Sequence, residues 1–509
     1  MNRPRTGIQL LAGAIALTSL TTACGLKPDA TATLKTGAGA AAAAAQNGVV
    51  PGAPGSSGIA PGAPGSAGNA PGTVAGGAPG SVVGGGTSNG GTTTTSNGGT
   101  TTTQPATGGA CGVPHNGTTT GITASTINVG VHAPLTGTGT PFPNTSFQAG
   151  AGKFWEQNGH EVCGRKVQVE FKDDTYTPAG ARQVCSQMAS RDFLVVGGGG
   201  TDQIQACATD PDIQRLGVPY LSAGVTDNGL TSLNNYFAVS LTYAQQGTLV
   251  LRNAKNQGIA DPSASNQPSD NITGQNAKWA VVTANSPNFA GARNGMEAAL
   301  KAAHIPYKDY QVSQQGNYQS DATQLGQQLA LNGFKTIFVD AAPGYFVFMT
   351  GGYYSASTSN TANWVGPGVT YTEVTVAQFI CNGTHNDISG HAWFLAPGPG
   401  IDKATADFKQ AYNGKFDDIE WALWGLSNSL WNLFKDASAN LTRQNFIAST
   451  EHATVPSQSG YAAIDYAHHG GHFGGTGAWV QRVNCSETEP NQNQNGQWDT
   501  VGGSYLKLY

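Results

Sequence analysis

The stretch Asp192–Cys207 constrains the fold of this chain most, because its physical character changes twice. Phe193–Val196 is an unbroken apolar run, which is typical of a strand buried on both faces. Gly197–Gly200 follows as a turn without side chains, and a helical pattern begins at Thr201. A strand, a glycine turn and a helix N-terminus expose several backbone N–H groups at one point, which attracts anions. The stretch predicts either a site for a carboxylate-like ligand or only a tight connection between strand and helix.

The N-terminus predicts export. Basic residues precede an apolar run, Ile8–Leu20, that is too short to span a bilayer and is followed by small residues before Cys24. This segment resembles the lipobox of bacterial lipoproteins, with Thr21 where leucine is usual. The resemblance implies that residues 1–23 are a signal peptide and that lipidated Cys24 anchors the protein to the outer face of the bacterial cell membrane. Cleavage near Ala23 without lipidation is the alternative.

Residues 24–110 predict a disordered tether. No charged residue occurs from Thr36 to Ala110, where Ala, Gly, Pro, Ser and Thr dominate. Such a composition cannot bury enough apolar surface to offset its chain entropy. Roughly 80 flexible residues span on the order of 50 Å. We expect this segment to hold the following domain away from the membrane.

The remaining residues, 111–509, exceed what one hydrophobic core usually organises, which predicts two lobes. The whole chain has 25 Lys plus Arg and 30 Asp plus Glu, with a formal net charge of −5. This balance provides no basic stripe for nucleic acid. Beyond the N-terminal run, no apolar segment is long enough to cross a membrane.

Six cysteines besides Cys24 predict disulfides in an exported chain and allow fifteen pairings. Their positions relative to the expected strands and helices favour Cys111–Cys163, Cys185–Cys207 and Cys381–Cys485. Metal ligation is the alternative, but no CxxC spacing occurs. The histidines His468, His469 and His472 also raise the possibility of a metal site. We predict neither a metal nor a cofactor.

Strand and helix patterns alternate through the folded part, as in doubly wound α/β sheets. Two such series follow one another, which predicts two lobes facing each other across a cleft, where pockets for small ligands concentrate. In the first series we expect strands at Ile127–His132, Lys166–Phe171, Phe193–Val196 and Val218–Leu221, and helices at Phe147–Asn158 and Pro178–Ser190. In the second we expect strands at Lys278–Thr283, Tyr310–Val312 and Lys335–Val339, and helices at Ala290–Ala303 and Asp321–Leu331.

No motif predicts catalysis. Residues 111–509 contain no Gly-x-Ser-x-Gly elbow, and the glycine turn lacks the nucleotide-binding spacing. In the acidic pairs Asp173-Asp174 and Asp417-Asp418, adjacent side chains point apart, so neither pair can share a proton. An aromatic stripe has helical spacing within Glu420–Lys435 and predicts a buried packing face rather than a ligand shelf. The stripe consists of Trp421, Trp424, Trp431 and Phe434.

Several motifs, in order and spacing, resemble those of type I periplasmic binding proteins, closest to the leucine/isoleucine/valine-binding and amide-binding proteins. They are Thr126–Val131 with Pro134–Gly137, Cys163–Val167, Asp173-Asp174, Gly217–Ser222 and Tyr243–Gly247. The resemblance runs from about Ile122 to the end of the chain. It implies an α/β fold of two Rossmann-like lobes joined by a three-crossover hinge. We expect lobe 1 to comprise 111–243 plus about 377–440, and lobe 2 to comprise 244–376 plus about 441–509.

The resemblance also implies the residues that contact the ligand. In the first lobe these are Phe142, Gly200, Thr201, Gly224 and Thr226, and in the second Phe289, Ala342, Tyr345 and Gly368. In amino-acid binders an acidic residue holds the ligand's ammonium, and that position here is Gly368. An ammonium without a counter-charge in a closed cleft is costly. We therefore favour a small carboxylate, amide or aromatic ligand, and keep amino acids open, with Asp340 or Glu373 as substitute partners.

Together these features predict an extracytoplasmic solute-binding lipoprotein of an ABC importer. It is expected to act as a monomer, to bind a small organic molecule and to pass it to permease and ATPase subunits. The alternatives are a ligand sensor of the same fold for a signalling partner, or an extracytoplasmic hydrolase.

Overall fold

The computed structural model describes residues 120–136, 144–222, 228–260, 279–314, 317–356, 361–368, 371–437, 441–457, 461–468 and 472–508. All of them belong to one compact unit that includes Ala110–Tyr509. The predicted signal peptide, Cys24 and the tether lie outside the described residues. None of the described helices is both long and apolar enough to cross a membrane.

The first sheet is built around the apolar run identified in the sequence. Its strand order is β2-β3-β1-β4-β5-β6, and all neighbours run parallel except β2 and β3. Its strands are β1 (Thr126–Ala133), β2 (Glu161–Val162), β3 (Arg165–Asp173), β4 (Leu194–Gly197), β5 (Tyr220–Ser222) and β6 (Tyr236–Ala238). Every residue of β4 is buried, as expected of a central strand covered on both faces.

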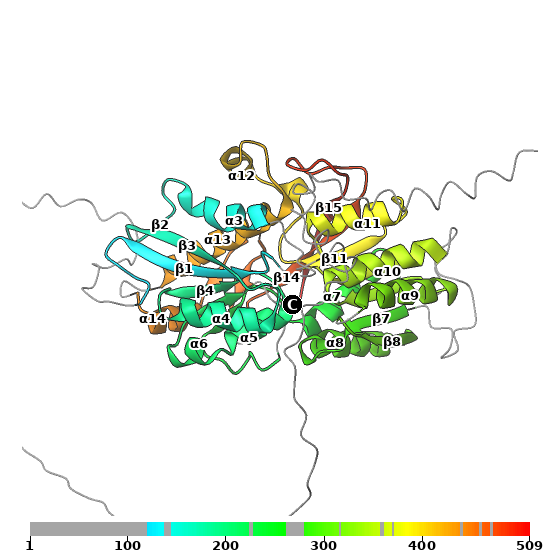
Figure 1. Cartoon of the computed structure of the whole chain (residues 1–509), viewed down its shortest axis with the longest axis horizontal. Coiled ribbons are helices and arrows are strands. Elements are labelled where there is room, and N and C mark those ends of the chain that lie inside the picture. The colour runs from blue at the N-terminus through cyan, green and yellow to red at the C-terminus, as the bar shows by residue number, and fades with distance from the viewer. Residues whose placement is uncertain are drawn as a thin grey trace, which may run out of the picture. The chain divides into compact units, whose positions relative to one another are not determined.

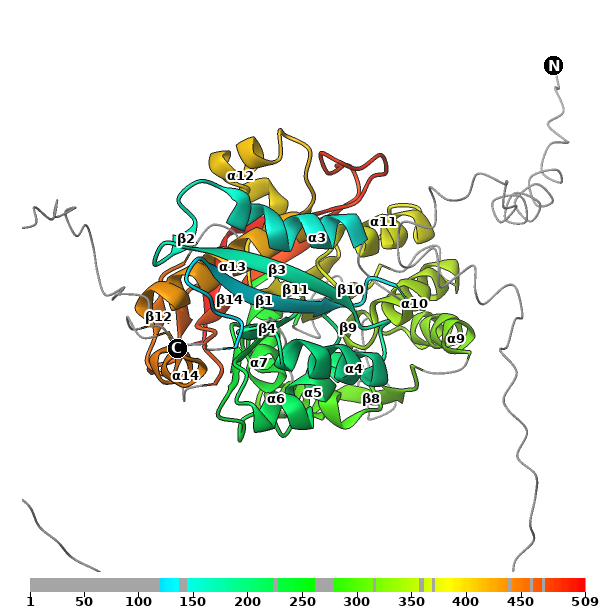
Figure 2. The ribbon, with the colours of Figure 1, turned by 60° about the vertical axis from the view of Figure 1, so that its left-hand side comes forward.

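Helices cover both faces of this sheet. The flanking elements are α3 (Asn144–Lys153), η2 (Phe154–Glu156), α4 (Pro178–Ala189), α5 (Thr201–Ala208) and α6 (Pro211–Arg215). Figure 2 shows α3 on one side of β1 and β3, with α4, α5 and α6 on the other. Helix α4 begins where its sequence requires, because Thr177 accepts a hydrogen bond from the Gly180 N–H and Pro178 occupies the first turn.

The second sheet has the order β15-β14-β11-β10-β9-β7-β8. Its strands are β7 (Trp279–Ala284), β8 (Tyr307–Val312), β9 (Thr336–Asp340), β10 (Asn363–Pro367), β11 (Ala392–Ala396), β14 (Gly477–Asn484) and β15 (Gln497–Lys507). Its helices are α7 (Tyr243–Asn256), α8 (Ala290–Ala302), α9 (Tyr318–Leu331), α10 (Pro343–Ala356) and α11 (Val374–Gly383), with η3 at Pro287–Phe289. β7 to β11 are parallel, and β14 and β15 add an antiparallel edge. The two-series α/β fold predicted from the sequence is confirmed.

Three crossovers join the two sheet systems, which lie side by side in Figure 1. The first follows β6 and enters α7, and the second leaves β11 at Pro397. The third precedes β14: Phe473 pairs in parallel with Ala238 at the edge of the first sheet. A side chain at Gly475 would overlap the Leu241 N–H, so two crossovers pass each other in direct contact.

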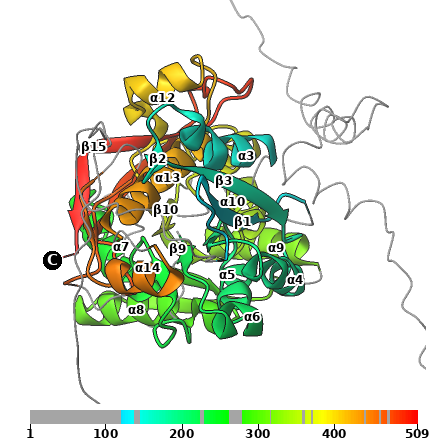
Figure 3. The same cartoon turned by 90° about the vertical axis from the view of Figure 1, so that its left-hand side faces the viewer.

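The C-terminal half is divided between the lobes differently from the prediction. α11 and β11, expected in lobe 1, belong to the second sheet system, because β11 pairs with β10 and β14. The segment that begins with α14 was expected in lobe 2. Its first part, up to β13, packs instead against the core of the first sheet. Its elements there are α14 (Arg443–Thr450), β12 (Thr454–Val455) and β13 (Ile464–Asp465). Helix α13 (Asp418–Asp436) packs against α3 in the first lobe, as expected, and Figure 3 shows α13 and α14 on that side.

Arg443 fixes α14 to the first lobe. Its guanidinium donates to the carbonyl oxygens of Ala189, Asp192, Phe193 and Leu216. Burial lowers the pKa of Arg443 to about 10. These carbonyls surround the start of β4, so the contact also positions the strand that leads into the glycine turn.

Two of the three predicted disulfides are confirmed. Cys185–Cys207 joins α4 to α5, and Cys381–Cys485 joins α11 to the end of β14. Cys111 lies outside the described residues, so its pairing with Cys163 stays a prediction.

Candidate ligand site

A cavity lies between the carboxyl ends of strands from both sheets, the position where open α/β sheets bind ligands. Its volume is about 100 Å³. One water needs at least about 10–15 Å³ by this measure, so the cavity accommodates a group of several non-hydrogen atoms. The lining residues are Phe147, Gly197–Gly200, Thr201, Ile204, Tyr243, Thr372, Glu373, Ala396–Gly400, Asp418, Ile419, Trp421, Ala422, Leu423, Leu426, Tyr461 and Gln481.

The glycine turn forms one wall of the cavity. Gly200 caps α5 in a left-handed conformation, with φ +77°. A side chain at Gly198 would overlap the Phe147 ring and approach the His132 carbonyl oxygen to 2.9 Å. The turn therefore has to be free of side chains, and its backbone borders the cavity. Gly197–Gly200 and Thr201 line the cavity, which favours a ligand site over a mere connection, and a ligand at this turn stays a prediction.

Three buried polar side chains, linked by hydrogen bonds, support the glycine turn. His132 Nδ1 lies 2.9 Å from Asp174 Oδ2, and His132 Nε2 lies 2.7 Å from the Tyr220 hydroxyl. The Tyr220 hydroxyl also occupies the space that a side chain at Gly197 would need. All three polar side chains are fully buried. Their contacts hold the glycine turn in place beside the carboxyl ends of β1 and β4.

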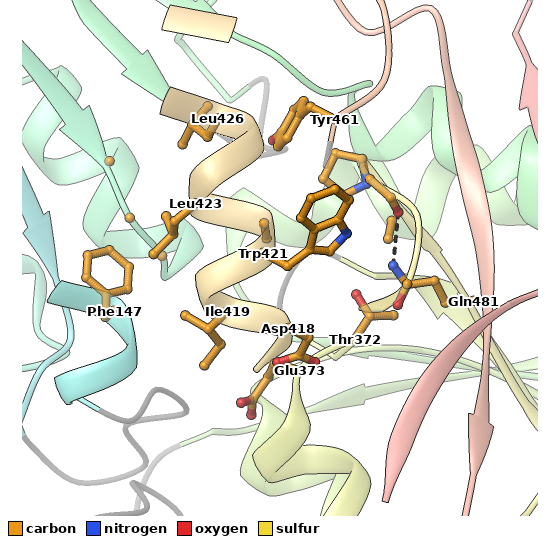
Figure 4. Close-up of a pocket in the computed structure, with 18 of the residues that line it drawn as sticks. Phe147, Thr372, Glu373, Asp418, Ile419, Trp421, Leu423, Leu426, Tyr461 and Gln481 are labelled. Atoms are coloured by element: carbon orange, nitrogen blue, oxygen red, sulfur yellow. Dashed lines mark hydrogen bonds between the residues drawn. The ribbon is translucent and has the colours of Figure 1, made fainter. Parts of the chain in front are cut away.

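Helix α13 supplies an apolar wall, shown in Figure 4 with Ile419, Trp421, Leu423 and Leu426 on the helix. The helix begins with a capping box, in which the Asp417 carboxylate accepts from the Glu420 N–H and the Glu420 carboxylate accepts from the Asp417 N–H. The expectation that its aromatic stripe is purely a packing face is therefore wrong at Trp421. That ring lines the cavity, and its Nε1–H donates to the Pro399 carbonyl oxygen at 3.1 Å.

The two lobes meet at the cavity. A hydrogen bond of 2.9 Å joins Thr201 Oγ1, on α5, to the hydroxyl of Tyr243, on α7. On its other side, the Tyr243 ring stacks on Phe289, with ring centroids 5.9 Å apart. Phe289 was expected to contact the ligand, whereas here Tyr243 lines the cavity and Phe289 lies behind it.

The structure brings together only some of the residues expected to contact the ligand. Gly200 and Thr201 line the cavity, whereas Phe289, Ala342, Tyr345 and Gly368 do not. The Gly368 N–H donates to the Leu395 carbonyl oxygen at 2.6 Å, and the Ala342 N–H donates to Gln314 Oε1. Phe142, Gly224 and Thr226 lie outside the described residues.

Four polar lining residues were not identified as cavity residues from the sequence: Thr372, Glu373, Asp418 and Gln481. Glu373 was considered only as a substitute partner for an ammonium, and Asp418 only as half of an acidic pair. The structure agrees that this pair points apart, since Asp417 caps α13 while Asp418 faces the cavity. Gln481 donates to the Gly398 carbonyl oxygen at 2.9 Å, as Figure 4 shows.

Two acids line the cavity, and the pKa of each lies above its ordinary value. Burial raises the pKa of Asp418 well above its ordinary value, and raises the pKa of Glu373 to about 8. Neighbouring carboxylates reinforce the shift of Asp418. Among the described lining residues there is no Lys, Arg or His to compensate a negative charge.

The raised pKa of Glu373 makes stability depend on pH. The ordinary pKa is 4.5 and the folded-state pKa about 8, so folding retains the proton. This contribution to the free energy of unfolding is complete below pH 4.5, declines above that value and is lost by about pH 8. We expect the melting temperature to fall as pH rises from 5 to 8, and to fall less in Glu373→Gln. The control is Asp407→Asn, on the exposed surface of α12 (Ala406–Ala411), which should keep the wild-type dependence of melting temperature on pH. If Glu373→Gln also kept that dependence, Glu373 would not be the group that retains a proton on folding.

Within the described residues, one set of three side chains could hold a metal ion, namely His132, Cys185 and Cys207. The two sulfurs form a disulfide, and both ring nitrogens of His132 already have polar partners. The histidines considered as a possible metal site have other partners where the structure describes them. His468 Nδ1 pairs with the Asp465 carboxylate, His472 Nδ1 contacts the Tyr236 carbonyl oxygen, and His469 lies outside the described residues.

Comparison with known proteins places the chain in a family. It matches the family model described as "Periplasmic binding protein" over residues 126–491. No curated protein matches it. Solved structures do, and at these sequence identities they show the fold alone. A fatty acid ABC transporter substrate-binding protein from Thermomonospora curvata is 14% identical, with 77% of this chain and 93% of that chain covered and a TM-score of 0.60.

Two further solved structures show the same fold. A solute-binding protein of an ABC transporter from Rhodopseudomonas palustris HaA2, in complex with p-hydroxybenzoic acid, is 14% identical, with 75% and 98% of the chains covered and a TM-score of 0.58. A leucine-binding protein from Thermotoga maritima is 14% identical, with 75% and 99% covered and a TM-score of 0.57. Since the family match covers more than half of the chain, the chain belongs to the periplasmic binding protein family, whose members are extracytoplasmic proteins that bind solutes without converting them.

Proposed function

We propose that this protein is the solute-binding lipoprotein of an ABC importer and that it binds a small carboxylate, amide or amino-acid-like molecule between its lobes. In this proposal residues 1–23 are removed, lipidated Cys24 anchors the chain and residues 24–110 tether it. The folded part acts as a monomer and delivers its ligand to permease and ATPase subunits.

The observation that carries the proposal is the cavity at the carboxyl ends of strands from both sheets. Its first-lobe wall is a glycine turn and helix N-terminus, which favours a negatively charged or polar oxygen on the ligand. Its other walls are largely apolar, which suits an organic body. Three relatives of the same fold are named for a fatty acid, p-hydroxybenzoic acid and leucine, each of which carries a carboxyl group.

Contacts between the lobes explain how binding would be signalled. Besides the Thr201–Tyr243 bond, the Asp202 carboxylate accepts from Ser286 Oγ at 3.3 Å and from Asn288 Nδ2. Asp202 lies on α5, whereas Asn288 lies on η3 and Ser286 caps that helix, in the second lobe. A ligand that contacts both walls favours the closed arrangement in which these bonds exist, and a permease can distinguish that arrangement from an open one.

A ligand screen tests the proposal. Amino acids, amides, short carboxylates and aromatic acids are added to the mature protein, and the melting temperature is measured. A ligand at about 100 times its dissociation constant stabilises by roughly 2.7 kcal/mol, which gives a clear shift. Absence of saturable binding across the panel would refute the proposal. A gene deletion that leaves uptake of the bound solute intact but removes a response to it would indicate a sensor.

Thr201→Val should weaken binding of the identified ligand about tenfold, because it removes a hydroxyl at the cavity together with the bond to Tyr243. Loss of one net hydrogen bond is worth about 0.5–1.5 kcal/mol. Isothermal titration calorimetry measures the change. The matched control is Thr209→Val at the other end of α5, where the hydroxyl bonds only within its own helix. Equal affinities in the two variants would contradict a role for Thr201.

A further inference from the structure

Five buried carboxyl groups gather where α11, α13 and the segment between β14 and β15 meet. They are Glu373, Asp417, Asp418, Glu420 and Glu489. In the part of the chain that the structure describes, none of them forms an ion pair with Lys, Arg or His. A cluster of acids without a counter-charge stays protonated or awaits a cation.

Three of the five have structural roles. Asp417 and Glu420 form the capping box of α13, and Asp417 Oδ2 also accepts from Ser146 Oγ at 2.6 Å. Glu373 caps α11 by accepting from the N–H groups of Thr375 and Val376. These contacts explain why the three carboxyls are present, without reference to a ligand.

Asp418 has no such role. Its carboxyl oxygens accept no well-aligned hydrogen bond among the described residues, although its side chain lines the cavity and the residue is only 6% exposed. The backbone N–H groups of Val374 and Ile419 lie close enough to lower the pKa of Asp418, but burial outweighs them. The Asp418 backbone N–H donates to Glu489 Oε2 at 2.9 Å, and Glu489 Oε1 is likewise without a partner among the described residues. Buried polar atoms in folded proteins are almost always satisfied, so an unsatisfied carboxyl that borders a cavity indicates a missing partner.

The surroundings favour an organic cation over a metal ion. Among the described residues, the oxygens of this cluster do not form a group of three within 4.8 Å, as metal ligation would require. The same cavity is walled by Ile419, Trp421 and Leu423, which suit an apolar body. A smaller cavity of about 20 Å³ lies behind Leu423 and Leu426, against the first sheet, and extends the apolar region.

We propose that Asp418, with Glu373 beside it, holds the protonated nitrogen of an amine ligand whose apolar body lies against α13. Figure 4 shows the two carboxyl groups at the base of α13, below the apolar side chains. The inference rests on the proposed solute-binding function and assigns the ligand a basic nitrogen, a group that amino-acid-like ligands carry and that plain carboxylates and amides lack. The residue that binds the cation is then Asp418, in the first turn of α13, and not the residue at position 368, where amino-acid binders carry their acid.

Amine binding should release a proton. Burial raises the pKa of Asp418, and the nearby carboxyl groups of Asp417, of Glu373 at the start of α11 and of Glu489 reinforce the shift. The ammonium binds the ionised carboxylate, so at pH 6.5 the acid has to give up its proton to the buffer. The affinity for an amine therefore rises with pH from 6 to 8, and calorimetry in buffers of different ionisation enthalpy detects about one proton released per ligand.

The experiment compares alkylamines and arylalkylamines with alcohols and carboxylates of the same length, on the mature protein. Wild type is expected to bind at least one amine at least tenfold more tightly than its matched alcohol, with proton release at pH 6.5. Asp418→Asn should lower that affinity at least 100-fold and abolish the proton release. Glu420→Gln should stay within twofold of wild type, because glutamine preserves the capping box and Glu420 does not line the cavity.

Circular dichroism and the melting temperature establish that Asp418→Asn folds. If it does not fold, proton release and amine preference in wild type still decide the question.

Three results would overturn the inference: saturable binding of carboxylates while amines do not bind, amine binding unaffected by Asp418→Asn, or a calcium-induced thermal shift that Asp418→Asn abolishes while amines give none. The first leaves the proposed solute-binding function intact, whereas absence of binding in every class refutes both.

Discussion

Replacing Gly198 with alanine is expected to weaken ligand binding at least tenfold and to lower the free energy of unfolding by about 1–3 kcal/mol, the usual cost of overpacking a buried site. The added methyl group would overlap the Phe147 ring and lie 2.9 Å from the His132 carbonyl oxygen. Both neighbours are buried and fixed, so the glycine turn has to move. A ligand site tolerates displacements of only about 0.5 Å.

Gly383→Ala is the matched control for Gly198→Ala. Gly383 is the last residue of α11, and a methyl group there meets no atom within 4 Å. The control should retain wild-type affinity and stability. Urea unfolding and calorimetric titration measure both quantities for the two variants. Wild-type affinity in Gly198→Ala would show that the glycine turn does not form the ligand wall.

Removal of the Cys381–Cys485 disulfide, by replacing both cysteines with alanine, should have the largest effect on stability. The bond closes a segment with a sequence separation of 104, and a loop of about 100 residues corresponds to about 4.7 kcal/mol in the chain-entropy model. Loss of the bond frees α11 from the end of β14. Chemical denaturation of the oxidised proteins measures the difference.

The Cys185–Cys207 pair provides the comparison. Its sequence separation is 22, so the same model gives about 3 kcal/mol. The order of the two double variants is therefore the result to check. A larger loss for the Cys185–Cys207 variant would mean that strain or residual structure, rather than loop length, sets the contribution of these bonds.

Most strands and helices could be predicted because their signals are local. Leu194–Gly197 is buried in a parallel sheet, and its apolar run stands out in the sequence. Helix α4 starts at Pro178 as predicted, where a capping threonine and a proline coincide. The first residues of β8 were missed because Lys308 and Asp309 are charged, exposed neighbours that break any alternation of apolar and polar residues. An edge strand of this kind carries little apolar signal.

The division of the C-terminal half could not be read from the sequence, because pairing between distant segments decides it. β11 follows α11 in the chain, yet its lobe is set by hydrogen bonds to β10 and to β14, which lies about 80 residues further on. α14 belongs to the first lobe because Arg443 reaches four backbone carbonyls there. Neither contact leaves a periodic pattern.

The candidate ligand site was predictable only where its residues form a local motif. The glycine turn is a local motif, and it lines the cavity as expected. Asp418 looked unremarkable, since one acid beside another at a helix start is a common cap. Only the tertiary arrangement shows that its neighbour takes the capping role and leaves Asp418 facing the cavity.

The three crossovers have a consequence for biosynthesis. Each lobe needs segments from early and late in the chain, and the last crossover precedes β14 at Gly477. Neither sheet system is therefore complete until residues from the last part of the chain are available. A chain with this connectivity completes both lobes only late, which suits an extracytoplasmic protein that folds after it has left the cytoplasm.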